Sequence, residues 1–149
     1  MLNIAPTLLK TILIADDDAD DRLFMIEALR QNGFRHEVRF VEDGEELMNY
    51  LTHQNGFTAE NAPFPSLILL DLNMPRKNGF QALAEIRGNV GLRRLPVVVM
   101  STSMASGDVA RTYEIGVNSY IIKPHNFNRL IEVVNSLKYY WLETVQLPD

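Results

Sequence analysis

The chain has 149 residues, of which 46% are hydrophobic and 22% charged, and its formal net charge is -5 at pH 7. This composition is typical of one folded domain and excludes a disordered chain, while the negative charge disfavours nonspecific binding to nucleic acid. Cysteine is absent, which excludes disulfides, thiolate metal sites and a cysteine nucleophile. No apolar stretch approaches the roughly 18 residues of a membrane span, and residues 1–9 do not resemble a signal peptide. We therefore expect a cytoplasmic protein that does not bind membranes.

Short apolar runs predict β-strands at residues 10–15, 37–41, 67–70, 96–100 and 120–122. The third and fourth runs are continuously apolar, which is typical of strands buried on both faces of a parallel sheet. The third run ends abruptly in a single carboxylate. We therefore expect the molecule to be organised around this strand.

A helix is expected after each strand, because apolar residues recur there at helical spacing. Asp18 can cap the first helix, with Asp20 and Asp21 in its first turn, where carboxylates interact favourably with the helix dipole. The fourth helix is expected over residues 106–115, and residues 53–65 form a long polar loop. The apolar faces expected for the other helices are Leu23, Ile26 and Leu29; Leu47, Tyr50 and Leu51; Phe80, Leu83 and Ile86; and Phe127, Leu130, Ile131, Val134, Leu137 and Trp141.

Strands that alternate with helices predict an α/β domain, in which a parallel five-stranded sheet carries helices on both faces in a three-layer sandwich. Such sheets place their chemistry just beyond the carboxyl ends of the strands. Those ends all lie at one edge, so side chains that are distant in sequence can meet there. The expected strands end in Asp16 and Asp17, in Asp71, in Ser101 and in Lys123.

Three carboxylates at one edge repel one another, at a cost on the order of 4 kcal/mol for a pair about 4 Å apart at an effective dielectric constant near 20. A divalent cation relieves this repulsion, and two carboxylates with a carbonyl and waters form a coordination that Mg²⁺ accepts. The cation would also keep Asp71 ionised, as a nucleophile must be. Lys123 and the Ser101 hydroxyl could contact oxygens of a phosphoryl group. We therefore interpret Asp71 as a phosphoryl acceptor.

Each of these residues also has a simpler interpretation. Asp16 and Asp17 could belong with Asp18 to a solvated helix start, Asp71 could be a turn residue, and Lys123 could be a surface charge. Their agreement at the ends of separate strands makes coincidence improbable and favours a shared site.

The chain resembles the receiver domain of two-component response regulators over nearly its whole length. The resemblance implies a flavodoxin-like (βα)5 fold with strand order 2-1-3-4-5. It also implies that the chain is no enzyme beyond catalysing its own phosphorylation and dephosphorylation. The matching motifs are Ile14-Ala15-Asp16-Asp17-Asp18, Leu70-Asp71-Leu72-Asn73-Met74-Pro75 with Gly79, Pro96-Val97-Val98-Val99-Met100-Ser101, and Ser119-Tyr120-Ile121-Ile122-Lys123-Pro124.

The resemblance assigns roles to the residues of these motifs. It implies that Asp71 accepts a phosphoryl group from a histidine kinase. It implies that Mg²⁺ is bound by Asp17, by Asp71 and by the backbone carbonyl of Asn73, while Asp16 acts through water. Lys123 would contact the phosphoryl group and would be joined to Pro124 by a cis peptide bond.

The resemblance also implies a switch and a control of the acyl phosphate's lifetime. Ser101 would be drawn toward the phosphoryl group, and Tyr120 would rotate into the vacated space. Asn73, Thr102 and Ser103 would tune the access of water to the phosphoryl group. This switch would alter the surface of the fourth helix, fifth strand and fifth helix.

The expected organisation is an N-terminal arm over residues 1–9, a receiver domain over 10–138 and a C-terminal extension over 139–149. The extension and the long loop resemble the stand-alone receivers paired with bacterial phytochromes, which implies a phytochrome-type kinase and a symmetric homodimer. With no DNA-binding module expected, output would pass to a downstream protein. An alternative is that the extension folds back on its own domain. The residues expected at the dimer interface are Tyr140, Trp141, Leu142, Val145 and Leu147.

Three other functions fit the sequence less well. A phosphatase of the haloacid-dehalogenase type would use Asp16, Asp18, Ser101 and Lys123, but the acidic pair it needs after the lysine is missing and Asp71 is left unexplained. A phosphorylation-independent scaffold would not need the acid-and-lysine set. Flavin binding has the least support, because the loop after the first strand is acidic, whereas a loop that holds a phosphate group is rich in Gly, Ser or Thr.

Overall fold

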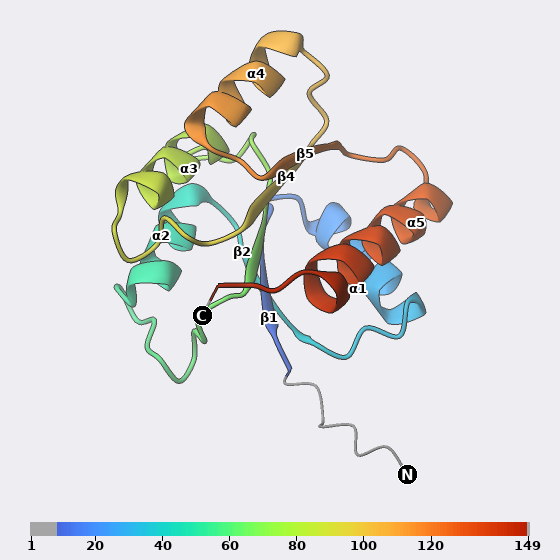
Figure 1. Cartoon of the computed structure of the whole chain (residues 1–149), viewed down its shortest axis with the longest axis horizontal. Helices are drawn as coiled ribbons and strands as arrows, with labels where there is room; N and C mark the ends of the chain where they lie inside the picture. The colour runs from blue at the N-terminus through green and yellow to red at the C-terminus, as the bar shows by residue number, and fades with distance from the viewer. Residues whose placement is uncertain (1–8, 149) are drawn as a thin grey trace.

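The computed structural model describes residues 9–148. Five strands alternate with five α-helices, as expected, and a π-helical segment follows the last helix (Figure 1). The elements are β1 (Thr11–Ala15), α1 (Ala19–Gln31), β2 (Glu37–Val41), α2 (Gly44–Thr52), β3 (Leu67–Leu70), α3 (Gly79–Gly88), β4 (Val97–Ser101), α4 (Ser106–Ile115), β5 (Ser119–Ile122), α5 (Phe127–Leu137) and η1 (Lys138–Thr144).

The five strands are parallel and lie in the order β2-β1-β3-β4-β5, which confirms the predicted fold class. β3 is central, between β1 and β4, and its four residues are all buried. Leu70 is in register with Ala15 on one side and with Val99 on the other. The residue after β3 is therefore held beside the ends of both neighbouring strands.

Alternate residues of each strand enter two separate cores, one on each face of the sheet. Ile68 and Leu70 of β3 face α2 and α3, whereas Leu67 and Leu69 face α1 and α5. Figure 1 shows α1 and α5 together on one side of the sheet, with α2 and α3 on the other. This arrangement explains why the central strands are apolar at every position.

Helix α1 buries a different face from the one expected. Asp18 caps it as predicted, accepting hydrogen bonds from the backbone N–H groups of Asp20 and Asp21. Of the expected face, Leu29 is buried, but Leu23 is 63% exposed and Ile26 is 45% exposed. The buried side chains are those of Met25, Ala28 and Leu29. The prediction was wrong because α1 carries apolar residues on two sides, and periodicity alone cannot say which side meets the sheet.

The chain continues helically beyond α5 and then turns back on its own domain. The Lys10 ammonium donates a hydrogen bond to the Leu142 carbonyl (3.0 Å). Leu142 and Leu147 join the core formed with α1 and α5. They are core residues of the single chain, and their assignment to a dimer interface stays a prediction. Among the expected interface residues, Tyr140 is exposed while Trp141 and Val145 are partly buried.

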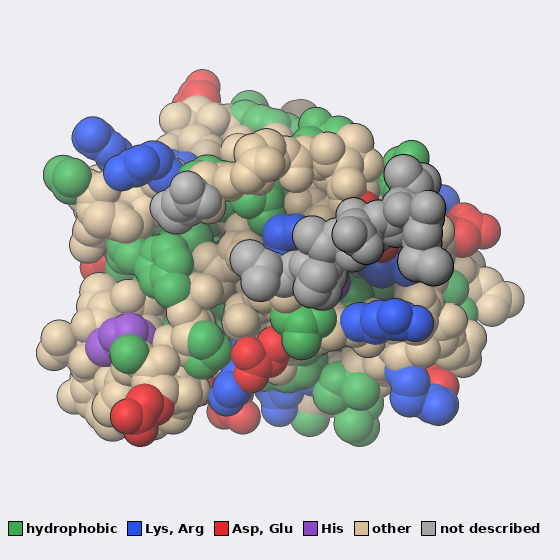
Figure 2. Space-filling model, turned by 60° about the horizontal axis from the view of Figure 1, so that its bottom comes forward, with side chains coloured by type: hydrophobic (Ala, Val, Ile, Leu, Met, Phe, Trp, Pro, Cys, Tyr) green, Lys and Arg blue, Asp and Glu red, His purple; other side chains and the backbone are tan. Residues whose placement is uncertain are grey.

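On the face turned forward in Figure 2, small groups of hydrophobic side chains are separated by charged and polar ones. Residues 1–8 of the expected N-terminal arm lie outside the described residues. Within residues 9–148, no helix is both long and apolar enough to cross a membrane.

Candidate functional site

The candidate site lies at the carboxyl edge of the sheet, where backbone hydrogen bonds extend the strand ladders by one residue. The Asp71 N–H donates to the Ala15 carbonyl (3.0 Å), which fixes Asp71 beside the end of β1. The Lys123 N–H donates to the Ser101 carbonyl (2.8 Å), which joins the ends of β5 and β4. The sheet itself therefore positions the backbones of these residues.

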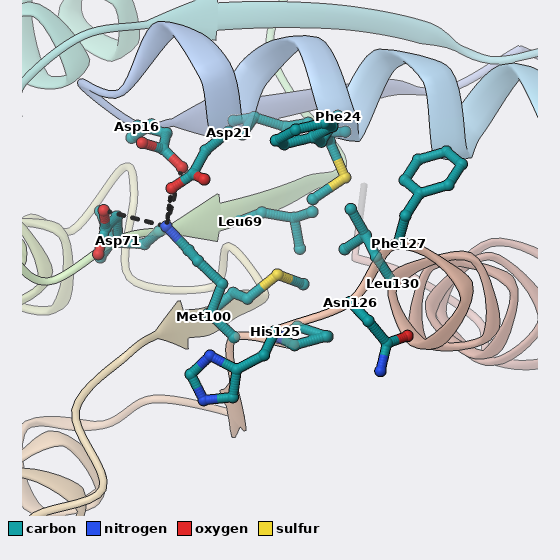
Figure 3. A pocket seen from close by; sticks show the side chains of 16 residues that line it. Asp16, Asp21, Phe24, Leu69, Asp71, Met100, His125, Asn126, Phe127 and Leu130 are labelled. Carbon is teal, nitrogen blue, oxygen red and sulfur yellow. Dashed lines mark hydrogen bonds and ion pairs between the residues drawn. The ribbon is translucent and has the colours of Figure 1, made fainter.

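The ammonium of Lys123 lies among three carboxylates. Its Nζ is 2.9 Å from Asp21 Oδ2, 3.1 Å from Asp16 Oδ2 and 3.4 Å from Asp71 Oδ2. In Figure 3 the side chains of Asp16, Asp21 and Asp71 lie close together, and dashed lines mark the contacts of the ammonium. Residues separated by up to 107 positions in the chain thus meet in one network.

Asp16, Asp17 and Asp71 form a group of carboxylates that could hold a metal ion, as the sequence predicts. One oxygen from each lies within 4.8 Å of the others. Asp16 and Asp71 are largely buried, whereas Asp17 is exposed. Oxygen donors of this number and charge fit a hard divalent cation that retains several waters.

Burial raises the pKa of both Asp16 and Asp71, although the nearby Lys123 ammonium opposes the rise. For Lys123, burial alone would lower the pKa, but the hydrogen bond to Asp21 and the charges of Asp71 and Asp16 raise it. Lys123 therefore stays charged at neutral pH. The carboxylates are only partly compensated by one ammonium, which favours the entry of a cation.

The loop from β3 to α3 carries the expected third ligand, Asn73. The Asn73 N–H lies 3.3 Å from Asp71 Oδ1 and donates a hydrogen bond to it, and the Asn73 side chain is exposed. A Cβ on Gly79 would collide with the Asp71 carbonyl oxygen and with Leu72, so the absence of a side chain lets α3 start close against the site. The start of α3 is therefore packed directly against the backbone of Asp71 and Leu72.

Ser101 and Tyr120, the expected switch residues, both contact the β4–α4 loop. The fully buried Ser101 hydroxyl accepts a hydrogen bond from the Ser103 N–H (3.3 Å), and the half-buried Tyr120 donates its hydroxyl proton to the Ser103 carbonyl (2.9 Å). Ser103 Oγ donates to Asp108 of α4 (2.7 Å), while Thr102 is exposed. One loop therefore links the end of β4 to both β5 and α4.

A cavity of about 130 Å³ opens beside the acidic group, between α1 and α5 (Figure 3). Its far end is apolar, and the exposed Phe24 lies at its side, 6.3 Å from the Phe127 ring between centroids. The other apolar lining residues include Met25, Leu69, Met100 and Leu130. The path from solvent to Asp71 on this side thus passes apolar side chains of two helices.

The Lys123–Pro124 peptide bond was expected to be cis, and this expectation was wrong because the bond is trans. The trans form is the more stable one for X–Pro bonds in general. In this structure it is compatible with the hydrogen bond from the Lys123 N–H and with the contacts of its ammonium.

The sequence reasoning missed two contributors to the site. Asp21 was assigned only to the helix dipole, yet it makes the shortest contact with Lys123. Arg22 donates from its guanidinium to the Asp16 carbonyl (2.8 Å) and so secures the turn after β1. Residue spacing carries no signal for these contacts, because they depend on how α1 sits on the carboxyl edge of the sheet.

Comparison with known proteins agrees with this geometry. Residues 12–135 match the model of the response regulator receiver domain. The response regulator Rcp1 of a Synechocystis strain is 42% identical over 139 residues, which cover 93% of each chain.

Two solved structures extend the likeness to the fold. The phosphorylated cyanobacterial phytochrome response regulator RcpA is 41% identical, with a TM-score of 0.88 over 95% of this chain and all of that one. The Mn²⁺-bound form of Rcp1 gives a TM-score of 0.85 at 42% identity, covering 94% of this chain and 99% of the other. Together with the acidic group described above, the metal-bound relative suggests that this chain binds a divalent metal. Receiver domains are in general signalling proteins, and the chain belongs to the response regulator receiver domain family.

Proposed function

We propose that this chain is a single-domain response regulator that accepts a phosphoryl group on Asp71 from a histidine kinase. The observation that carries the proposal is the placement of one largely buried carboxylate, that of Asp71, beside Asp16, Asp17 and the Lys123 ammonium. This is the set of charges that transfer of a phosphoryl group to a carboxylate requires.

In the proposed step, an Oδ of Asp71 forms a bond to phosphorus while the bond from phosphorus to a histidine nitrogen of the kinase breaks. That nitrogen keeps the bonding electrons, and because the other ring nitrogen of the phosphohistidine carries a proton, the leaving group is neutral imidazole. The Lys123 ammonium leaves its carboxylate contacts to pair with a phosphoryl oxygen, and the Ser101 hydroxyl donates to another. Asn73, Thr102 and Ser103 then control how easily water reaches the acyl phosphate.

We assign Mg²⁺ to the acidic group, with Asp17, Asp71 and the Asn73 carbonyl as direct ligands and Asp16 acting through water. When bound, the cation neutralises the carboxylates and the incoming phosphoryl group. The support is the spacing of the carboxylate oxygens, and the Mn²⁺ in the Rcp1 relative is a second divalent cation of similar ligand preference.

The proposed output begins at Ser101. When Ser101 turns toward the phosphoryl group, its hydrogen bond from Ser103 is lost, and the β4–α4 loop that also holds Tyr120 is released. Tyr120 can then rotate inward, which changes the surface formed by α4, β5 and α5. A downstream protein would read that surface.

We propose a sensor histidine kinase of the phytochrome type as the partner, because the most similar relatives include phytochrome response regulators. Its docking surface is assigned to the exposed Leu23 and Phe24 of α1, next to the cavity that leads to Asp71. Such a kinase uses ATP, so the transfer is placed in the cytoplasm. A homodimer is proposed through Tyr140, Trp141 and Val145.

The test is the intact mass of the protein after incubation with acetyl phosphate and Mg²⁺. The wild type should gain one phosphoryl group and Asp71→Asn should gain none. Asp20→Asn, which alters an exposed carboxylate in the first turn of α1, should behave as the wild type. A wild type that takes up no phosphoryl group would instead support a phosphorylation-independent scaffold. An unchanged adduct in Asp71→Asn would contradict the assignment.

The phosphatase alternative has less support. In such an enzyme Asp16 would be the nucleophile and Asp18 the acid. Asp16 Oδ1 accepts a hydrogen bond from the Asp18 N–H, its Oδ2 pairs with Lys123, and Asp18 is engaged as the cap of α1. Steady turnover of phosphate esters that is lost in Asp18→Asn would favour this alternative.

A further inference from the structure

The loop from β3 to α3 is fastened to α2 as well as to the site. The Gly44 N–H at the start of α2 donates a hydrogen bond to the Lys77 carbonyl of this loop (2.8 Å). A Cβ on Gly44 would collide with that same carbonyl, so the two segments touch backbone to backbone. The loop that carries Asn73 therefore has a second support, at the start of α2.

The centre of this support is an ion pair between Asp43 and Arg76. Asp43 is 1% exposed, and its Oδ1 accepts the N–H of Glu46 (2.7 Å) as the cap of α2. Its Oδ2 accepts hydrogen bonds from Arg76 Nε (2.8 Å) and Nη2 (2.7 Å). Burial alone would raise the pKa of Asp43, but these hydrogen bonds lower it, so the carboxylate is charged. A buried charge of this kind strongly favours retention of its partner.

Arg76 is also unusual in its backbone. Its φ is +63°, in the left-handed region that costs free energy for any residue other than glycine. Its side chain is 65% exposed, so packing does not hold it there. The ion pair with Asp43 holds the Arg76 side chain, and with it the path of the loop between Asn73 and Lys77.

We propose that Asp43 and Arg76 are positioning residues that hold the Asn73 carbonyl where the metal requires it. Neither touches the metal or the phosphoryl group; they act through the backbone of the β3–α3 loop. This inference rests on the proposed function, because it concerns the affinity of the Mg²⁺ site and the rate of phosphorylation at limiting Mg²⁺.

The experiment measures Mg²⁺ affinity by calorimetry on the full chain, together with the rate of phosphorylation by acetyl phosphate at limiting and at saturating Mg²⁺. Arg76→Ala should weaken Mg²⁺ binding about tenfold, the lower end of the usual loss when a residue that orients a ligand is removed. Its phosphorylation should be slow at limiting Mg²⁺ and recover at saturating Mg²⁺. A role confined to stability would not give this recovery.

Three further variants separate the contributions. Arg76→Gly removes the backbone strain together with the ion pair, and it should still bind Mg²⁺ weakly. Arg76→Lys keeps the charge but loses the two-pronged contact, and it should fall between Arg76→Ala and the wild type. Arg93→Ala removes an exposed arginine on a different loop and should match the wild type.

Asp43→Asn combined with Arg76→Ala should be no weaker than Asp43→Asn alone, because both changes break one interaction. The inference is overturned if Arg76→Ala binds Mg²⁺ as the wild type does, or if Arg76→Gly restores full affinity. Failure of the proposed function looks different, since the wild type itself would then bind no Mg²⁺ or accept no phosphoryl group.

Discussion

Some side chains of the acidic site destabilise the folded protein. Burial disfavours the charged forms of Asp16 and Asp71, and one ammonium, that of Lys123, is shared among three carboxylates. In the function proposed above, the same carboxylates would bind the cation and Asp71 would accept the phosphoryl group, which accounts for this imbalance. A substitution that removes one of these carboxylate charges should therefore impair function and raise the stability of the metal-free protein.

Asp71→Asn should stabilise the metal-free protein at pH 7. Folding raises the pKa of Asp71 above its ordinary value of 3.8. Between the two pKa values, the Asp71 carboxyl is therefore mostly ionised in the unfolded chain and mostly protonated in the folded protein. Ionisation of Asp71 therefore lowers the free energy of unfolding as the pH rises, and this loss is complete above the folded pKa. Asparagine removes the loss, so Asp71→Asn should have a higher free energy of unfolding than the wild type at pH 7. Urea unfolding without Mg²⁺ measures it, and a less stable Asp71→Asn protein would contradict the argument.

His36 should make stability depend on pH in the opposite direction. Burial and the nearby Lys10 charge lower its pKa below 6.5, and its Nδ1 accepts a hydrogen bond from the Lys10 N–H (2.9 Å). The stabilising neutral form is fully present above pH 6.5 and is lost as the pH falls through the folded pKa. Protonation at Nδ1 breaks a hydrogen bond worth about 1 kcal/mol. Urea midpoints at pH 7.5 and pH 5 should differ more in the wild type than in His36→Gln, and equal differences would exclude this role.

At this scale, the sequence predicted the residues whose position follows from the sheet. Asp16, Asp71 and Lys123 directly follow strands, and parallel strands bring their ends together. The pairing of Asp21 with Lys123 depends on how a helix sits on the edge, and the positive φ of Arg76 depends on the path of a loop. Neither has a signal in residue spacing, and both were missed.

At the scale of elements, the start of α3 sets how closely the loop approaches the site. Gly79→Ala places a methyl group against the Asp71 carbonyl, so it should destabilise the fold by about 1–3 kcal/mol and weaken Mg²⁺ binding. Gly88→Ala, at the other end of α3, meets open space and should stabilise the fold by about 0.5–1 kcal/mol. Thermal unfolding of both variants is the measurement. Equal effects would mean that close packing at Gly79 is unimportant.

Helix α1 presents its exposed apolar side chains beside the path to Asp71. Phe24 is 54% exposed and lies next to Phe127. If a kinase docks there, Phe24→Ala should slow phosphoryl transfer from a phosphorylated histidine kinase about tenfold, as expected of an aromatic interface residue. The rate with acetyl phosphate should not change, because that donor needs no docking. Phe64→Ala, which removes an exposed aromatic side chain from the loop before β3, is the control, and an equal loss in both variants would contradict docking at α1.

The elements themselves were largely predictable because their patterns are local. β3 and α4 have the predicted bounds, residues 67–70 and 106–115. The buried face of α1 was not predictable, because the choice between Leu23 and Met25 is made by the sheet and α5.

At the scale of the whole molecule, both faces of the sheet are covered and the end of the chain completes one of them. The segment after α5 adds Leu142 and Leu147 to the core with α1, while a hydrogen bond from Lys138 Nζ to the Asn32 carbonyl (3.0 Å) fastens it to the end of α1. The sequence correctly indicated that some apolar side chains of this segment are buried. It could not tell which of these apolar residues pack in the chain's own core and which would contact a partner, because cores and interfaces bury the same residue types.

Substitutions at the exposed and at the buried residues of this segment should have different effects, the first on dimer formation and the second on the stability of the fold. Tyr140 is exposed and stacks edge-on against Trp141, with ring centroids 5.3 Å apart, so together they offer an aromatic surface to a second copy. Tyr140→Ala and Trp141→Ala should shift the molecular mass measured by light scattering from dimer toward monomer while the protein stays folded.

Leu147→Ala should instead cost about 2–4 kcal/mol of unfolding free energy, because it leaves a cavity in the core of each copy. At temperatures where Leu147→Ala is still folded, its mass should be that of the wild type. A wild type that is monomeric at all concentrations would contradict the dimer. A loss of dimer in Leu147→Ala without loss of stability would mean that Leu147 is released from its own core to face the partner.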